Sequence, residues 1–296
     1  MNPRRIAAAP ALLVAVSAAA LAIPACSAPS GSDAQNPVAS SAPTAAAPTP
    51  SADPIETTVA SAAPSAAPSA TVVAAAAPPP PECPAGMVKV PGGKFEAGAL
   101  KRKVEIKDLC VDKTEVTAGA YAECVKAGKC NEFFMACGVG ATYNVPGAEN
   151  KPIVCVDYQQ AKTFCEYRGA RLPLDEEWEW VARGGDEARK YAWGAEEPKD
   201  QACWSGEAGG PLKGPCEVGS HPAGTNALGI ADLTGNVFEW TSSKADSTGA
   251  SLVCHGGSWK DGSAQGLAVA RPGGFKTEYK CGFGGMRCFT EVPPTP

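Results

Sequence analysis

The chain has 296 residues, a net charge of −5 and 44% hydrophobic residues. This acidic balance provides no electrostatic footprint for a phosphate backbone and argues against nucleic acid as a partner. Thirteen cysteines beside two histidines argue against a histidine-rich metal centre and favour an exported, disulfide-bonded protein.

The amino terminus predicts export and lipid anchoring. Arg4 and Arg5 precede an apolar run, 6–23, that is short and rich in alanine, as is typical of a secretory signal at 1–25. The run ends in Ile-Pro-Ala-Cys26, which resembles a bacterial lipobox, so we expect a lipidated Cys26 that anchors the chain to a membrane without spanning it. The serine that follows favours the outer membrane or cell surface. Ordinary signal cleavage with an unmodified Cys26 is the alternative.

Residues 26–82 have the composition of a tether. They are almost entirely Ala, Pro, Ser, Thr, Val and Gly, and they contain no aromatic residue. Such a segment cannot bury a core and, at about 3 Å per residue, it reaches on the order of 150 Å when extended. The remaining residues, 83–296, predict one domain of about 210 residues.

The first elements of this domain read as strands. Segments 87–90 and 94–97 flank Pro91-Gly92-Gly93, and this pattern predicts a hairpin. Beyond Tyr191 the chain predicts short strands separated by glycine-rich turns.

Three short helices are predicted between these regions. Thr117 caps a helix at 118–126, and Asp157 caps a second helix that ends before Gly169. A third helix spans about 175–183, with an acidic first turn. The tryptophans of this helix are expected to be buried.

Four segments carry a family resemblance. They are RLPLDEEWEWVARGG at 171–185, GNVFEWTSS at 235–243, GGSW at 256–259 and GMRC at 285–288. In the same order they resemble the signature segments of the formylglycine-generating enzyme, or sulfatase-modifying factor, family over about 87–291. The resemblance implies an α+β, C-type-lectin-like single domain that is disulfide-rich and has little regular secondary structure.

The resemblance also implies that copper is absent. Catalytic members carry a pair of cysteines shortly after GGS[YW] that binds copper(I) and oxidises a substrate cysteine to formylglycine. Here that stretch, 260–274, contains no cysteine, and soft copper(I) requires thiolates. Cys254 and Cys281 are either displaced redox thiols or members of structural disulfides, for example with each other.

A calcium site is the metal prediction. Asp232, Gly235, Val237 and Glu239 match the ligands of one calcium site of the family, with aspartate replacing an asparagine at the first position. Two carboxylates and two carbonyls on a tight turn suit Ca²⁺. The alternative is the same turn held by hydrogen bonds without metal.

Two disulfides follow from the resemblance. Cys165 and Cys288 stand where the family links an early helix to the last strand. The second calcium site of the family is degraded here, and a Cys203–Cys216 disulfide is the hypothesis for what ties that loop. Family members also usually have a threonine at the position of Leu174, which caps the third helix; Asp175 is the expected substitute.

These features predict a non-catalytic binding module for a peptide, a glycan or an envelope protein at the cell surface or in the periplasm. An oxidoreductase of the formylglycine-generating type acting on a protein cysteine is the alternative, and it requires an accessible thiol. A purely structural envelope module is the third reading, and it requires neither a ligand site nor a thiol.

Overall fold

The computed structural model describes residues 82–98, 101–206 and 212–293. The predicted signal segment, Cys26 and nearly all of the tether lie outside the described residues. Within the described part, no helix is both long and apolar enough to cross a membrane.

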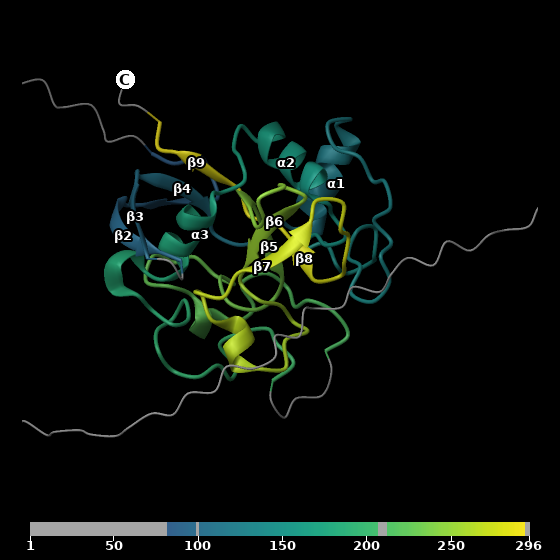
Figure 1. Cartoon of the computed structure of the whole chain (residues 1–296). Helices are drawn as coiled ribbons and strands as arrows, with labels where there is room; N and C mark the ends of the chain where they lie inside the picture. Colours follow the sequence, from purple (N-terminus) through teal and green to yellow (C-terminus); the bar gives the residue numbers. More distant parts are fainter. Residues whose placement is uncertain (1–81, 99–100, 207–211, 294–296) are drawn as a thin grey trace, which may run out of the picture. The chain divides into compact units, whose positions relative to one another are not determined.

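Two small antiparallel sheets form the first part of the domain (Figure 1). One has the order β1-β4-β9 and the other pairs β2 with β3. Their strands are β1 (Met87–Val90), β2 (Gly93–Ala97), β3 (Arg102–Ile106), β4 (Leu109–Asp112) and β9 (Phe289–Glu291). The C-terminal strand β9 therefore closes a sheet begun by the first strands of the domain.

The predicted strands exist, but the predicted pairing between them is wrong. β1 pairs with β4 and β2 pairs with β3, so 87–90 and 94–97 belong to different sheets. The link between them is held by the rest of the domain: Trp180 Nε1 donates to the Pro91 carbonyl at 2.9 Å. A Cβ on Gly92 would lie 2.1 Å from the Ile106 oxygen. Local alternation is the same for either partner, so only these distant contacts decide the pairing.

Among the described residues the domain has three α-helices, and the first two begin where their caps predict. The helices are α1 (Ala118–Lys126), α2 (Tyr158–Tyr167) and α3 (Asp175–Ala182). The side chains of Thr117 and Asp157 each accept a hydrogen bond from the backbone N–H three residues on. α1 and α2 contact each other (Figure 1). A cap is a local interaction, and therefore it can be read from the sequence.

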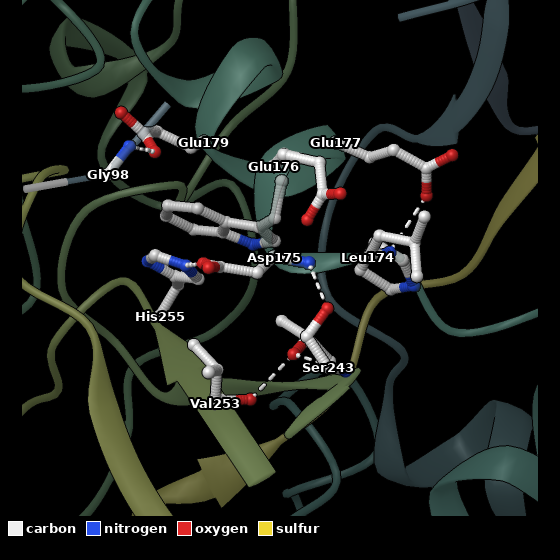
Figure 2. A network of polar contacts seen from close by, with 12 residues as sticks. Gly98, Leu174, Asp175, Glu176, Glu177, Glu179, Ser243, Val253 and His255 are labelled. Atoms are coloured by element: carbon white, nitrogen blue, oxygen red, sulfur yellow. Dashed lines mark hydrogen bonds and ion pairs between the residues drawn. The ribbon is translucent and has the colours of Figure 1, made fainter. Parts of the chain in front are cut away.

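The start of α3 departs from the prediction, because Asp175 does not cap it. Leu174 occupies the N-cap position without a side-chain hydrogen bond from the helix. Asp175 is the first helical residue; its backbone N–H donates to Ser243 Oγ at 2.9 Å, and its carboxylate lies against His255 (Figure 2). Glu177 Oε2 accepts from the Leu174 N–H at 2.8 Å, so one half of a capping box remains.

A third sheet has four strands, in the order β7-β6-β5-β8. β8 runs parallel to β5, and the other pairs are antiparallel. The strands are β5 (Phe238–Lys244), β6 (Ser251–His255), β7 (Gly273–Lys276) and β8 (Gly284–Gly285). Three single-turn 3₁₀ helices occupy Gly185–Glu187, Pro222–Gly224 and Ala264–Leu267. The domain is thus α+β with short elements, as predicted.

The two faces of this sheet differ in chemistry. Side chains alternate along a strand, and residues paired across strands share a face. The register pairs Glu239 with His255 and Trp240 with Cys254. We call the side that carries Glu239, Thr241 and His255 the polar face. We call the side that carries Phe238, Trp240, Cys254 and Phe275 the aromatic face.

Five disulfides cross-link the described residues. They are Cys83–Cys110, Cys124–Cys130, Cys137–Cys155, Cys165–Cys288 and Cys203–Cys216. The two pairs expected from the family resemblance, Cys165–Cys288 and Cys203–Cys216, are among them, whereas the Cys254–Cys281 bond that the sequence left as one alternative is not. Cys254 and Cys281 stand outside these five bonds. Multiple disulfides suggest an extracellular or periplasmic protein.

Candidate functional site

A buried ion pair anchors the polar face. Arg287 Nη2 donates to Glu239 Oε1 at 2.8 Å, and both side chains are at most 1% exposed. Trp178 Nε1 on α3 donates to Glu239 Oε2 at 2.6 Å. The remaining guanidinium N–H groups donate to the carbonyls of Asp112 and Ala231 at 2.9 and 2.8 Å. Because every charged atom has a partner, the pair joins β4, β5 and α3 in one arrangement.

Asp112 extends this network toward α2. Its two carboxylate oxygens accept from Arg168 Nη1 at 2.9 Å, and one of them accepts from the Cys288 N–H at 3.0 Å. Burial raises the pKa of Asp112, and the Arg168 charge opposes that rise. The Cys165–Cys288 disulfide links the same two segments covalently. The end of α2 is therefore joined to the segment that enters β9 in two ways: through the Arg168–Asp112 ion pair, whose carboxylate also binds the Cys288 N–H, and through the Cys165–Cys288 disulfide.

Glu115 is a buried acidic residue whose carboxyl group has no hydrogen-bond partner among the described residues. It is 1% exposed, and neither carboxylate oxygen has a hydrogen bond. Burial, and then the neighbouring Asp232 carboxylate, raise the pKa of Glu115 well above its usual value, while Arg287 opposes the rise. Asp232 Oδ2 accepts from the Gly219 N–H at 2.5 Å. Glu115, Asp232 and Glu239 thus place three carboxylates near the single Arg287 guanidinium.

Three of the four predicted calcium ligands lie on the loop that enters β5, and Glu239 is the second residue of that strand. Asp232, Gly235, Val237 and Glu239 are all buried. Asp232 and Gly235 have left-handed backbones, with φ of 59° and 87°. Both oxygens of Glu239 already accept hydrogen bonds, whereas Asp232 Oδ2 accepts from one backbone N–H. Oxygens that remain available to a metal ion are therefore found on the Asp232 side of the turn rather than at Glu239.

Sequence reasoning missed Glu115 and Arg287. Glu115 is the glutamate of an EVT segment just after β4, and Arg287 is the arginine of GMRC. Each is a charged residue beside buried apolar positions, Val116 and Met286. That placement signals a buried charge in need of a partner, although it does not say which partner.

His255 is held as a structural residue. Its Nε2 lies 2.5 Å from Asp175 Oδ1, and its ring stacks on Trp178 with centroids 4.5 Å apart (Figure 2). Nδ1 is buried without a partner. Ser243 Oγ accepts from the Asp175 backbone rather than contacting the imidazole. These three residues therefore do not form a nucleophile, base and acid relay.

Comparison with known proteins identifies the fold family. Residues 73–292 match the model described as a sulfatase-modifying factor enzyme 1-like domain. The chain belongs to this family. "Inactive C-alpha-formylglycine-generating enzyme 2" of Bos taurus is 38% identical over 129 residues, which cover 40% of this chain and 42% of that protein. The chain therefore spans less than half the length of that relative.

Two further members of the comparison cover more of the chain. "Formylglycine-generating enzyme" of Streptomyces coelicolor is 28% identical over 291 residues, covering 73% of this chain and 92% of that protein. Among solved structures, "Crystal Structure of CarF" aligns with a TM-score of 0.56 and 19% identity, covering 71% of this chain and 99% of that chain. The latter likeness shows the fold alone.

Catalytic members of the family are expected to carry their cysteine pair within residues 260–274. In this chain a carboxylate, that of Asp261, makes hydrogen bonds at the start of the segment. Asp261 Oδ2 accepts from the Ser258 N–H at 2.8 Å and from Ser258 Oγ at 3.0 Å. Burial raises the pKa of Asp261. A Cβ on Gly266 would lie 2.5 Å from Asp261 Oδ1. Asp261 therefore ties the start of this segment to Ser258, and the absence of a side chain at Gly266 leaves room for the Asp261 carboxylate.

A cavity of about 280 Å³ abuts this segment at Val269 and Ala270. Its charged lining residues are Glu96, Lys101, Glu179, Arg183 and Arg189. Within the lining, Arg183 Nη1 pairs with Glu179 Oε1 at 3.0 Å. Glu179 Oε2 also accepts from the Gly98 N–H at 2.8 Å (Figure 2). The cavity offers both charge signs to a small polar group.

The Cys203–Cys216 disulfide lies beside His221. The ligand atoms of these three residues all lie within 4.8 Å of one another. Because both sulfurs are in a disulfide, they offer no thiolate to a metal ion. The group is a loop cross-link in this structure.

Proposed function

We propose that this family member is a non-catalytic binding module on an exported, lipid-anchored chain. One observation carries the proposal: residues 260–274 contain no thiol. Copper(I) prefers thiolate ligands, and this segment supplies none. The relative named as an inactive formylglycine-generating enzyme supports the same reading.

The oxidoreductase alternative depends on the two other cysteines. A reactive cysteine is ionised and accessible. Cys254 is 1% exposed and Cys281 is 6% exposed. Burial raises the pKa of Cys254 well above its usual value. Both features oppose a role for these thiols toward a substrate cysteine.

An activity assay separates the two functions. The full-length exported chain is incubated with copper(I) and a cysteine-containing sulfatase-type peptide, and the peptide is analysed by mass spectrometry. We expect the same aldehyde background as with a Cys254→Ala/Cys281→Ala variant. Formylglycine formation that exceeds this matched control by tenfold or more would establish the oxidoreductase function instead.

The ligand site of the binding module is assigned to the cavity beside Val269 and Ala270. Its paired charges suit a polar group of a peptide or a glycan. Peptide and glycan arrays probed with the full-length chain identify the ligand. Ala270→Trp fills the cavity rim and is expected to weaken binding at least tenfold, whereas Val145→Trp, which also places an indole on the surface, is the control. Equal binding by both variants would place the ligand elsewhere.

Calcium is proposed as a structural ion of the same module. The carboxyl of Glu115 has no hydrogen-bond partner and lies near Asp232, and a hard cation there would stabilise the ionised forms of both groups. Asp232 and the carbonyls of Gly235 and Val237 would hold it, with Glu239 already engaged by Arg287. The ion would supply charge neutralisation and rigidity to the turn.

Thermal unfolding tests the ion. At about a hundred times its Kd, a ligand of the folded state adds about 2.7 kcal/mol, so Ca²⁺ should raise the Tm and a chelator should reverse the rise. Asp232→Ala should abolish the shift, and Asp246→Asn, at a half-buried carboxylate in the turn between β5 and β6, should keep it. A Tm that is the same with calcium and with chelator would show that hydrogen bonds alone hold the turn.

Lipid anchoring is proposed through Cys26. Mass spectrometry of the amino-terminal peptide should find diacylglyceryl-cysteine at the start of the mature chain, and Cys26→Ala should move the protein from the membrane to the soluble fraction. An unmodified amino terminus produced by cleavage elsewhere would remove the anchor from the proposal.

A further inference from the structure

Two cysteines remain after the disulfides are assigned. Apart from Cys26, the chain has twelve cysteines, and ten of them form five disulfides. Cys254 on β6 and Cys281 before β8 are the others, and both are buried. In a chain that has oxidised every other cysteine of the domain, a buried dithiol calls for an explanation.

The backbone register places both sulfurs on the aromatic face. Cys254 is opposite Trp240, and Gly284 is opposite Phe238. Phe238 and Trp240 are two residues apart on β5, so they point to the same side. Their shared contact with Phe275 agrees with this, with centroids 5.2 and 6.2 Å apart.

Cys281 lies over β8. Its Sγ is 3.2 Å from the position that a Cβ on Gly284 would occupy. Any larger residue at Gly284 would therefore displace the Cys281 sulfur. The absence of a side chain at this point lets the thiol settle on the sheet face that also carries Cys254.

The surroundings keep Cys254 in the thiol form. Burial, and next the Cys281 thiol, raise the pKa of Cys254 well above its usual value. Attack on an oxidant needs a thiolate, so the reaction should be slow in the folded domain. It should be faster while the segment before β8 is still unpacked, during folding after export.

We propose that Cys254 and Cys281 are a redox site whose two-electron oxidation forms a sixth disulfide between β6 and the segment 280–284. Each thiol loses a proton, and the two electrons reduce a disulfide-class oxidant to its dithiol. The S–S bond requires the sulfurs to close to about 2.0 Å. Cys254 is held in a strand between β5 and β7, so segment 280–284 supplies the movement.

The new bond would reach an exposed loop. Lys280 Nζ donates to the Phe133 carbonyl at 2.6 Å, and the Cys281 carbonyl accepts from the Cys155 N–H at 3.0 Å. Phe133 and Phe134 are 66% and 68% exposed. Tying 280–284 to β6 would therefore slow hydrogen exchange in the loop around Phe133 as well as in the sheet.

Thiol trapping tests the site. The exported full-length chain, purified without reductant, is denatured in N-ethylmaleimide and analysed by intact mass and by non-reduced peptide mapping. We expect no label and a Cys254–Cys281 linked peptide. Two labelled thiols that become this linked peptide after treatment of the native protein with oxidised glutathione, with loss of two hydrogen atoms, would equally support the site.

Two results would overturn it. Thiols at both positions that persist after the reduced, unfolded chain is refolded with oxidised glutathione, while the other five linked peptides form, would show that the sulfurs do not pair. A peptide linking Cys254 to any cysteine other than Cys281 would show a different framework. Cys254→Ser and Cys281→Ser are each expected to expose one labelled thiol while the other five linked peptides persist. The wild-type peptide map decides the question even if a variant fails to fold.

Discussion

The two faces of the β5–β6 pair are stabilised by different kinds of contact. On the polar face, Glu239 and His255 are held by directional contacts to Arg287, Trp178 and Asp175. On the aromatic face, rings pack against one another and two cysteines lie among them. Moving a buried charged group away from its partners leaves it unsatisfied, whereas apolar contacts carry no such directional requirement. The polar face therefore serves as the anchor, and the aromatic face can accommodate a change such as a new disulfide.

The largest expected effect is loss of the anchor. Arg287→Met leaves Glu239 as an uncompensated buried charge and should lower the free energy of unfolding by about 3–5 kcal/mol. Urea denaturation measures it. Lys107→Met breaks the exposed pair with Glu291, whose side chains are 77% and 60% exposed, and is the control, expected below about 1 kcal/mol. Similar losses for the two variants would mean that the buried pair is not an anchor.

A smaller effect is expected on the aromatic face. Trp240→Phe removes one ring and the hydrogen bond from Trp240 Nε1 to the Val156 carbonyl at 3.1 Å. We expect a loss of about 1–3 kcal/mol in the free energy of unfolding, measured in the same urea experiment. If this loss exceeded that of Arg287→Met, the aromatic face would be the more rigid of the two, contrary to our comparison.

Restoring the cap of α3 should strengthen the element that covers the polar face. Leu174 has an extended backbone (φ −75°, ψ 158°) and is 41% exposed. Threonine there can accept a helix N–H and should add about 1 kcal/mol to the free energy of unfolding, seen as a rise in Tm. Leu228→Thr, at a residue 40% exposed and away from any helix start, should give no rise. Equal shifts would attribute the gain to lost surface hydrophobicity.

The smallest effect concerns the turn that joins β5 to β6. Hydrogen bonds, first from the Thr248 hydroxyl, lower the pKa of Asp246 to about 2. A lowered carboxyl pKa stabilises the fold above the unfolded value of 3.8, and this contribution disappears as the pH falls toward about 2. NMR titration of the Asp246 carboxyl measures it. Thr248→Val should move the pKa upward; an unchanged value would rule out the hydroxyl as the main cause.

Local signals and the family resemblance predicted much of the fold. The caps at Thr117 and Asp157 located two helices. The pairing of Cys165 with Cys288 came from the resemblance. The cap expected from Asp175 was wrong, because His255, 80 residues away, binds its carboxylate.

By itself, the sequence determined where the three helices and the first two strands of the domain lie, that the tryptophans of the third helix are buried, and that residues 260–274 carry no thiol. These properties depend on neighbours within a few residues. Only the tertiary structure decided that β1 pairs with β4, that Arg287 satisfies Glu239, and that Cys254 and Cys281 share a face. Each of these depends on which distant segments meet, and burial, charge pairing and strand register select the partners only once the whole chain has packed.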